Sequence, residues 1–578
     1  MERRVLAATV LAFLVLYAYN TFLVPPAPKK AAEPPPAAAA TQQPSSSSTT
    51  ASDTTTPALP AVQTLTSEPN EREIVVETST VEVVFTNRGA RALHWRLKNY
   101  HDDQGKPVDL VPTALPPNQP SPFALRVDDP QISSRLESAI YRIEGDSSGR
   151  VDATTSSATL AFEYQDASGL QARKELRFEP RNYVVIFSAD VKNGGQPINA
   201  TVGWGPGLGD VGALASGGSF FTGNAVQAPQ AIFERAGKVE RLARTKLEDQ
   251  GVQEATFRFA GVDDHYFIAT AVNPGQARLE YHAIDLPSGT AQRPLVSYGI
   301  RIAGGARNVK FYVGPKQFDL LQAVDQELVR AIDYGMFAWL VIPLLGALKW
   351  VHGFTGNYGG AIVVLTVLIN LVMFPLRHKS MVSMRKMQAI QPQIKAIQDR
   401  YAELKMTDPA KQKMNTEVMN LYREKGVNPA SGCVPMLLTF PVLFAFYAML
   451  SQSIELRGAD FGLWIHDLSQ RDPYYVTPLF MGATMFWQQW MMPATGDPSQ
   501  RQMMMVMPFV FTAMFLRLPS GLAIYYLVSN VLQVGQQYLT NYLIGPPPVQ
   551  APRPPAERRV KNAGAGRTIA ADKRSSAG

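Results

Sequence analysis

The chain contains almost no cysteine, and its methionine is concentrated in one half. One cysteine, Cys433, occurs in 578 residues, so no intramolecular disulfide can form. No CxxC pair or Cys/His cluster predicts zinc or iron–sulfur ligation, and we expect neither a metal site nor a cofactor. Apart from Met1, the 20 methionines all lie after residue 330, together with most of the long apolar runs. The first half therefore resembles a soluble protein, and the second half resembles a membrane protein.

Sequence signatures of catalysis are also scarce. The stretch GWGPGLGD, residues 203–210, lacks the Lys-Ser/Thr ending and the following helix pattern of a phosphate-binding loop, so we predict an ordinary loop. Asp263, Asp264 and His265 occupy consecutive positions of an expected strand, where side chains alternate between faces. They are therefore not expected to converge on one catalytic site, and we predict that the protein is not an enzyme.

The N-terminal segment predicts a membrane anchor followed by a linker. Arg3 and Arg4 precede 20 mostly apolar residues, 5–24. A helix of that length reaches about 30 Å, the thickness of a bilayer core. Residues 1–24 are too long and too apolar at their end for a cleaved signal peptide, so an uncleaved transmembrane signal anchor is predicted. Residues 25–69 are rich in Pro, Ala, Ser and Thr and predict a disordered linker.

From about residue 70 to 315 the pattern changes to short alternating runs. VEVVFTNRGA (81–90), ATLAFEYQDASG (158–169) and RNVKFYVG (307–314) alternate with period two and end at Asn, Gly or Asp. This pattern is typical of antiparallel strands. The sequence predicts one all-β domain, a β-sandwich, over residues 70–315.

Apolar segments dominate the rest of the chain. Residues 316–355 are predicted to be a connecting region. Its aromatic-rich stretch, 334–352, predicts a helix at the membrane surface, and a helix that crosses the membrane is the alternative. Five further apolar segments are each expected to form a transmembrane helix, which makes six with the anchor. These five helices are expected to form a core domain, residues 356–545. The five segments are 358–376, 431–453, 475–492, 503–518 and 520–543.

The distribution of positive charge predicts the orientation in the membrane. Residues 377–425 contain eleven Lys/Arg and five Asp/Glu, and the tail, 546–578, contains seven and two. The loop from 451 to 475 instead contains two Lys/Arg and four Asp/Glu. Because basic segments stay in the cytoplasm, both termini are predicted to be cytoplasmic and the β domain periplasmic. Arg517 is the exception, near the outer end of the fifth span.

Residues 377–427 predict a cytoplasmic helical hairpin. Apolar side chains recur in steps of three and four from Met381 to Leu404, and again from Met414 to Leu421. Pro392 is expected to kink or divide the first helix. The outward face is basic, which suits a solvated face and also anionic lipid headgroups. The basic residues assigned to the hairpin and to its junction with the spans are Arg377, Lys379, Arg385, Lys386, Lys395 and Arg400, with His378 beside them.

Polar side chains recur inside the apolar segments. Asn370 lies within IVVLTVLINLVMFPL, residues 362–376, and Thr366 shares its helical face. Polar groups in spans usually face a bundle interior or a water-filled cavity, so these helices are predicted to enclose a hydrophilic groove. Hydrogen bonding between dry helices is the alternative interpretation. The residues predicted to line the groove are Thr366, Asn370, Gln488, Tyr525, Tyr526, Ser529 and Gln533.

Four long motifs resemble those of the YidC membrane protein insertases of Gram-negative bacteria. The resemblance covers residues 330–543 closely and extends to the order of anchor, linker, β-sandwich and five-helix core. The motifs are KMQAIQPQIKAIQDRY (386–401), VNPASGCVPMLLTFPVLFAFYAML (427–450), LWIHDLSQRDPYYVTPLFMGATMF (463–486) and LPSGLAIYYLVSN (518–530).

This resemblance implies a function. A member of the family inserts and helps to fold nascent inner-membrane proteins, alone or with the Sec translocon, through a groove open to cytoplasm and lipid. The implied partners are nascent membrane proteins, the ribosome, the Sec translocon and membrane lipids, with no specific DNA. The implied location is the bacterial inner membrane. A small-molecule or lipid transporter that uses the same polar recess is the alternative, and a membrane-tethered carbohydrate-active enzyme is the third.

One position departs from the family pattern. The residue aligned with Asn370 is commonly an arginine in the family, thought to attract acidic residues of the substrate, and an amide supplies no charge. The hypothesis from the sequence is that wetting of the groove suffices here, with positive charge from Arg377, His378 and Lys379 at its mouth.

Overall fold

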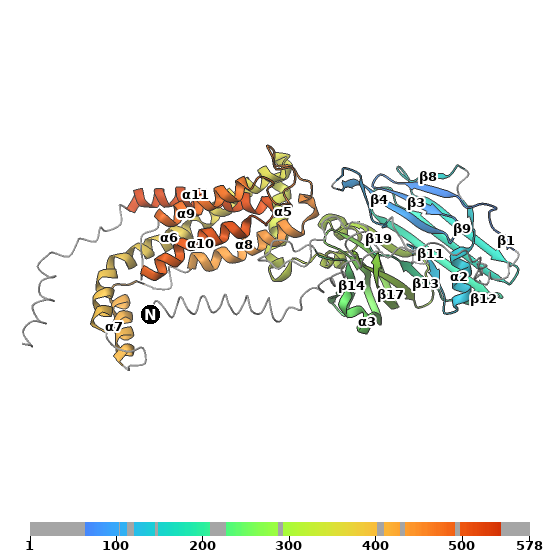
Figure 1. The fold of residues 1–578 in the computed structure, drawn as a ribbon, viewed down its shortest axis with the longest axis horizontal. Coiled ribbons are helices and arrows are strands. Elements are labelled where there is room, and N and C mark those ends of the chain that lie inside the picture. The colour runs from blue at the N-terminus through green and yellow to red at the C-terminus, as the bar shows by residue number, and fades with distance from the viewer. Residues whose placement is uncertain are drawn as a thin grey trace, which may run out of the picture. The chain divides into compact units, whose positions relative to one another are not determined.

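The computed structural model describes residues 64–102, 104–112, 121–144, 148–208, 227–286, 293–401, 410–427, 434–491 and 498–544 (Figure 1). The predicted anchor (1–24), most of the predicted linker (25–69), the basic tail (546–578) and Cys433 lie outside the described residues. What is described divides into a β-rich region followed by a helical region.

The β-rich region contains a large and a small sheet. The path through the larger sheet, which has 14 strands, is antiparallel at every pairing of neighbours. Along it lie β1 (Thr64–Thr66), β9 (Ala158–Asp166), β10 (Leu170–Phe178), β11 (Val184–Asn193), β19 (Val309–Pro315), β17 (Phe267–Leu286), β16 (Val252–Asp263), β14 (Gln230–Arg235) and β15 (Lys238–Leu242). Attached to it are β6 (Leu125–Arg126), β7 (Arg142–Glu144), β12 (Gln196–Ile198), β13 (Thr201–Trp204) and β18 (Arg293–Ile302).

The smaller sheet has five strands and packs against the larger one through aromatic side chains. Phe85 lies 6.0 Å from both Phe162 and Phe178 of the larger sheet, measured between ring centroids. Trp95 lies 5.9 Å from Trp204 in the same way. These contacts join two sheets face to face, as the alternating runs predicted. The strands, in spatial order, are β5 (Pro107–Asp109), β4 (Arg91–His101), β3 (Val81–Thr86), β2 (Glu73–Glu77) and β8 (Arg150–Asp152).

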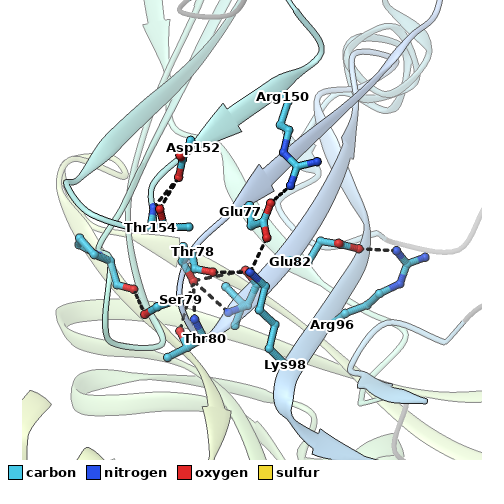
Figure 2. Close-up of polar contacts among 12 residues, drawn as sticks. Glu77, Thr78, Ser79, Thr80, Glu82, Arg96, Lys98, Arg150, Asp152 and Thr154 are labelled. Carbon is cyan, nitrogen blue, oxygen red and sulfur yellow. Dashed lines mark hydrogen bonds and ion pairs between the residues drawn. The ribbon is translucent and has the colours of Figure 1, made fainter. Parts of the chain in front are cut away.

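Charged side chains link β2 both to its neighbour β8 and to the non-neighbouring strand β4 of the smaller sheet (Figure 2). Lys98 Nζ on β4 donates to Glu77 Oε1 on β2 at 2.7 Å, and to the carbonyl oxygen of Thr78 at 2.7 Å. Arg150 on β8 pairs with the other oxygen of Glu77. Because these side chains are partly exposed, they contribute little stability and mainly fix the register at this edge.

Short helices also occur in and after the β-rich region. The helix α2 (Pro130–Ser138), which the sequence analysis missed, begins where Asp129 accepts hydrogen bonds from the backbone of Gln131 and Ile132. The other short elements are η2 (Arg244–Lys246), α3 (Leu247–Gln250), α4 (Phe318–Val324), η3 (Gln326–Ala331) and η4 (Gly335–Phe337).

A helix covers each of the five predicted apolar segments of the second half. They are α6 (Tyr358–Arg400), α8 (Val434–Gln452), α9 (Val476–Met491), α10 (Pro498–Phe515) and α11 (Ser520–Ile544). The turn η6 (Ile454–Leu456) follows α8. Within the described residues, two helical segments are long and apolar enough to cross a membrane by themselves, Gly335–Thr355 and Tyr358–Arg400. Six spans were predicted, and these two segments alone do not confirm that number.

The helix α5 (Ala338–Thr355) covers the stretch predicted to lie at the membrane surface. Its side chains Val341, Leu345 and Leu348 are buried, whereas Trp339 and Trp350 are exposed. Both faces are thus apolar, which fits a helix in contact with protein on one side and lipid on the other. Gly356 ends it with φ +63°, a conformation that favours glycine.

The long helix α6 differs from the prediction at Pro392. It continues without a break through Pro375 and Pro392 to Arg400, so the first hairpin helix is an extension of the second predicted span and is not divided at Pro392. Its end lies beside α7 (Ala410–Glu424) (Figure 1). A small core joins them and contains Ile390, Ile394 and, just after α7, Val427. This packing stabilises a helix that proline alone would interrupt.

Candidate functional site

The helix α11 lies between α6 and α9 and is hydrogen-bonded to both. On each side, the residue numbers rise together along the two helices, so α6 and α9 both run parallel to α11. The contacts to α6 join Asn370 with Ser529 (3.0 Å), the Phe374 carbonyl oxygen with Gln536 (3.2 Å), and His378 with Thr540 (3.3 Å). The contacts to α9 join Thr484 with Asn530 (3.4 Å), Gln488 with Gln533 (3.0 Å), and the Met491 carbonyl oxygen with Gln537 (3.1 Å).

Asn370 is the centre of the contact between α6 and α11. Its Nδ2 donates to the carbonyl oxygen of Thr366 at 2.8 Å and to Ser529 Oγ at 3.0 Å. Its Oδ1 accepts a hydrogen bond from Arg377 Nη1. The Thr366 hydroxyl donates to the carbonyl oxygen of Ile362 at 2.6 Å. Three of the predicted groove residues therefore meet at one point, and a cation joins them.

The predicted groove residues fall into a buried and a partly exposed group. Thr366 is 0 % exposed, Ser529 5 % and Asn370 8 %. These three lie in a closed contact between helices, as the alternative interpretation of dry hydrogen bonding expects. Gln488, Gln533 and Tyr526 keep part of their surface exposed.

The two tyrosines of α11 contact different helices. Tyr525 is buried, and its ring stacks on Phe446 of α8 with centroids 4.1 Å apart. Tyr526 points its ring toward α10, 5.3 Å from the Phe515 ring. Together they place aromatic surface and phenolic hydroxyls next to the polar residues of α11 that bond to α6 and α9. These residues, here called the polar stripe, are Ser529, Asn530, Gln533, Gln536, Gln537 and Thr540.

The predicted basic residues do not form one surface. Lys379, Lys386, Lys395 and Arg400 are exposed, and Arg400 lies 3.6 Å from Glu417 on α7. The other two predicted cations turn inward instead. Arg377 is half-buried and bonds to Asn370. Arg385 is 9 % exposed and bonds to Asn541 at the end of α11, so it differs from the predicted outward basic face.

Sequence reasoning missed part of the polar stripe. Asn530, Gln537 and Thr540 are buried, and each bonds to a neighbouring helix. The available signal was their spacing, because seven residues separate Asn530 from Gln537 and Gln533 from Thr540. Polar residues at such spacing in an apolar helix predict a shared buried face.

The acidic and histidine residues near the end of β16 have structural partners. Asp263 is 0 % exposed and pairs with Lys316 Nζ at 3.0 Å. Asp264 Oδ1 accepts from the backbone N–H of Phe267 at 2.7 Å. His265 Nε2 lies 2.7 Å from the carbonyl oxygen of Ser451. Burial, together with nearby Lys316, lowers the pKa of His265 to about 4, so its ring is neutral at pH 7. These buried bonds fit structural roles better than catalysis.

The outer faces of the same helices are apolar and exposed. Val372 on α6 is 77 % exposed, Trp490 on α9 68 % and Phe509 on α10 66 %. Large exposed apolar surface of this kind is typical of contact with lipid. Among the described residues, no group of three or more His, Cys, Asp or Glu is placed to hold a metal ion.

Two family models together match most of the chain. Residues 73–347 match the YidC periplasmic domain, and residues 350–545 match the 60Kd inner membrane protein family. The polar stripe and Asn370 lie in the second match.

Curated relatives match over nearly their whole length. The membrane protein insertase YidC of Geobacter metallireducens is 35 % identical over 94 % of this chain and 98 % of its own. That of Citrifermentans bemidjiense is also 35 % identical, over 94 % and 99 %. That of Syntrophus aciditrophicus is 34 % identical over 82 % and 85 %.

Solved structures give weaker likenesses. A crystal structure described as an active YidC insertase with its first transmembrane domain resolved is 18 % identical, with a TM-score of 0.34, over 82 % of this chain and 94 % of that one. A galactose mutarotase-like protein from Lactobacillus casei is 12 % identical, with a TM-score of 0.28, over 42 % and 100 %. On the two family models and the long sequence relatives, the chain belongs to the YidC family of membrane protein insertases.

Proposed function

We propose that this protein inserts segments of newly made proteins into the inner membrane and assists their folding there. The observation that carries the proposal is the buried polar stripe that α11 shares with α6 and α9, inside helices whose other faces are apolar and exposed. The relatives' common name, membrane protein insertase, supports it.

The physical role of the stripe is to lower the cost of moving polar groups into the bilayer. Each Asp, Lys or Arg at the centre of a bilayer costs about 2.5–3.5 kcal/mol on insertion scales. A groove lined by Asn370, Gln488, Tyr525, Tyr526, Ser529 and Gln533, reached from the cytoplasm when the helices part, hydrates and hydrogen-bonds such groups. No covalent chemistry is needed, so the mechanism requires no cofactor.

The proposed placement has six membrane spans, both termini in the cytoplasm and the β-rich region in the periplasm. The parallel direction of α6, α9 and α11 supports it, because all three then run from the periplasmic to the cytoplasmic side. The basic hairpin formed by the end of α6 and α7 then faces the cytoplasm, where the ribosome is the proposed partner. The Sec translocon and anionic lipids are proposed partners on the family resemblance and on charge.

The transporter alternative is not supported by the relatives, whose names describe insertases. It would also predict related halves with broken helices at corresponding positions, and the sequence has no such repeat.

Crosslinking to ribosome-bound nascent chains tests the proposal. A photoreactive residue at position 370 should capture a nascent single-span protein, because this position lines the proposed path. The same residue at position 372, on the exposed apolar face of α6, serves as the matched control and should capture mainly lipid. Equal capture of nascent chains at both positions, or none at 370, would contradict the proposal.

A further inference from the structure

Two arginines, Arg471 and Arg517, lie close together at the start of α11. Because α11 runs parallel to α6, this end of the bundle is the one away from the hairpin. The backbone N–H of Ser520 donates to the carbonyl oxygen of Gln470 at 2.6 Å. Arg471 follows Gln470 directly, and Arg517 precedes Ser520 by three residues. Both side chains are exposed, and long side chains anchored so close to one hydrogen bond are able to reach the same ligand.

The fold leaves the charge of both arginines available. The nearest acidic residue in the sequence is Asp472, which is buried. One of its oxygens accepts from the indole N–H of Trp464 at 3.1 Å, and the other accepts from the backbone N–H and the hydroxyl of Thr477, each at 2.7 Å. Its carboxylate therefore organises the loop before α9. Within the described part of the chain, neither Arg471 nor Arg517 forms an ion pair with a carboxylate.

Positive charge is unusual at this end of the bundle. The proposed placement puts it on the periplasmic side, whereas basic residues are normally concentrated in the cytoplasm. Arg457 lies on the same side, but it has aromatic partners. Its guanidinium carbon lies 5.2 Å from the centre of the Tyr266 ring and 5.3 Å from that of Phe267. Arg457 therefore serves the contact with the β-rich region, and Arg471 and Arg517 require another explanation.

Exposed aromatic and apolar side chains begin next to the arginines. Tyr474 and Tyr475 are exposed shortly after Arg471, and tyrosine is enriched at the boundary between bilayer and water. Leu479 and Phe480 are exposed in the first turns of α9. Moving along α9 from the arginines, the surface thus changes from cationic to aromatic to apolar.

The helix α10 adds to the same apolar surface. The rings of Phe486 and Phe509 lie 5.9 Å apart, measured between centroids, and a Cβ atom at Gly482 would overlap the hydroxyl of Thr512. The two helices therefore approach closely and run antiparallel, because the residue numbers rise in opposite directions. The end of α10, just before Arg517, lies beside the start of α9. The exposed Phe509 ring then extends the apolar surface away from the arginines.

We infer that Arg471 and Arg517 bind the phosphate of an anionic phospholipid in the outer leaflet, whose acyl chains lie along the exposed apolar side chains of α9 and α10. Guanidinium groups bind phosphate oxygens through parallel, charge-assisted hydrogen bonds. A lipid fits better than an acidic protein segment, because the apolar surface beside the cations suits acyl chains. The inference goes beyond the proposed function and takes from it only the periplasmic position of this end.

Photolabelling in bilayer nanodiscs tests the inference. The full chain is placed in phosphatidylcholine discs that contain a trace of phosphatidylglycerol or phosphatidylcholine with a diazirine in the acyl chain, and mass spectrometry identifies labelled peptides. Phosphatidylglycerol should label the peptides containing Phe480 and Phe509 more strongly than phosphatidylcholine does. The double variant Arg471→Gln/Arg517→Gln should lose this preference, with labelling by phosphatidylglycerol reduced about tenfold, the scale of a lost charge-assisted hydrogen bond.

Two controls accompany the double variant. Lys192→Gln combined with Lys310→Gln removes the same charge from exposed positions of β11 and β19, and should leave the preference unchanged. The peptide containing Val372, on the exposed apolar face of α6, should be labelled equally in every variant. Thermal unfolding in detergent checks that each variant is folded.

The outcomes separate the inference from the proposed function. Equal labelling by the two lipids in the unmodified protein, or a preference that persists in the arginine double variant, would overturn the inference. Loss of the preference on addition of inorganic phosphate or an acidic peptide would assign the arginines to a soluble anion, and would overturn it too. Insertion of a single-span client is measured with the same preparations. An arginine-dependent preference without any insertion would refute the proposed function alone.

Discussion

Three buried or half-buried cations in this protein have different partners. Lys174 is fully buried and donates only to backbone carbonyl oxygens, those of Gly89 (2.7 Å), Ala90 (2.9 Å) and Phe123 (2.9 Å). Lys316 pairs with the carboxylate of Asp263. Arg377 has a neutral amide oxygen as its hydrogen-bond partner. The first two are satisfied within the fold and serve structure, whereas the half-buried guanidinium of Arg377 bonds to an uncharged group.

Replacing Lys174 with Met tests the structural role at this scale. Methionine fills the space of the aliphatic stem but leaves three buried carbonyl oxygens without their donor. Each unsatisfied buried group costs about 1–3 kcal/mol, so we expect a loss of about 3 kcal/mol or more. Thermal unfolding of the detergent-solubilised chain, followed by circular dichroism of the strands, measures it.

Arg177→Met is the matched control, because Arg177 lies on the exposed side of the same strand. It should change the unfolding temperature little. A similar shift for both variants would mean that Lys174 contributes only as ordinary surface charge.

At the scale of elements, α6 belongs to two structures. Its first part packs in the bundle beside α11, and its last part forms the hairpin with α7. The hairpin core consists of few apolar side chains, including Ile390, Ile394 and Val427. A core this small contributes limited stability, so the hairpin depends on each of them.

Ile394→Ala should therefore loosen the hairpin without disturbing the bundle. Ile394 is 4 % exposed, and such a truncation costs about 2–5 kcal/mol in a well-packed site. We expect faster hydrogen–deuterium exchange across α7, Ala410–Glu424, and unchanged exchange in α11. Lys395→Ala, at the adjacent exposed position, should leave both unchanged. If α7 exchanged as slowly in the Ile394→Ala variant as in the unmodified protein, this result would contradict a packed hairpin.

At the scale of the whole molecule, the charge distribution and the helix directions agree. Residues 377–425 carry an excess of positive charge, and three of the helices run parallel. With single connections across the membrane, parallel α6, α9 and α11 require that α8 and α10 run in the opposite direction. In the proposed placement, the β-rich region and the hairpin lie on opposite sides of the membrane.

Cysteine labelling tests this placement. After replacement of Cys433 by Ser, single cysteines at Gly105 in the β-rich region and at Lys413 in the hairpin are treated with a membrane-impermeant maleimide in spheroplasts. We expect labelling at position 105 in intact spheroplasts and at position 413 only after permeabilisation. The reverse pattern would overturn the proposed orientation.

The sequence predicted local features well because they depend on nearby residues. Periodicity predicted the helices that cover the five apolar segments, and it predicted the two-sheet arrangement. It also predicted the apolar side chains that pack in the hairpin. Contacts between distant residues were less predictable. The hydrogen bond between Asn370 and Ser529 joins residues 159 apart, and no pattern within one helix specifies it. Pro392 was expected to kink or divide the helix, and the division was wrong because packing against α7 stabilises the continuous helix.

By itself, the sequence determined the membrane character of the second half, the β-rich first half and the family, since hydropathy, alternation and long motifs are properties of the chain. The tertiary structure alone decided which polar side chains meet, and that Arg377 turns inward to Asn370 while Lys379 stays exposed. The physical reason is that the direction of a long side chain depends on partners brought by other helices. Here Ser529 of α11 orients the amide that holds the guanidinium.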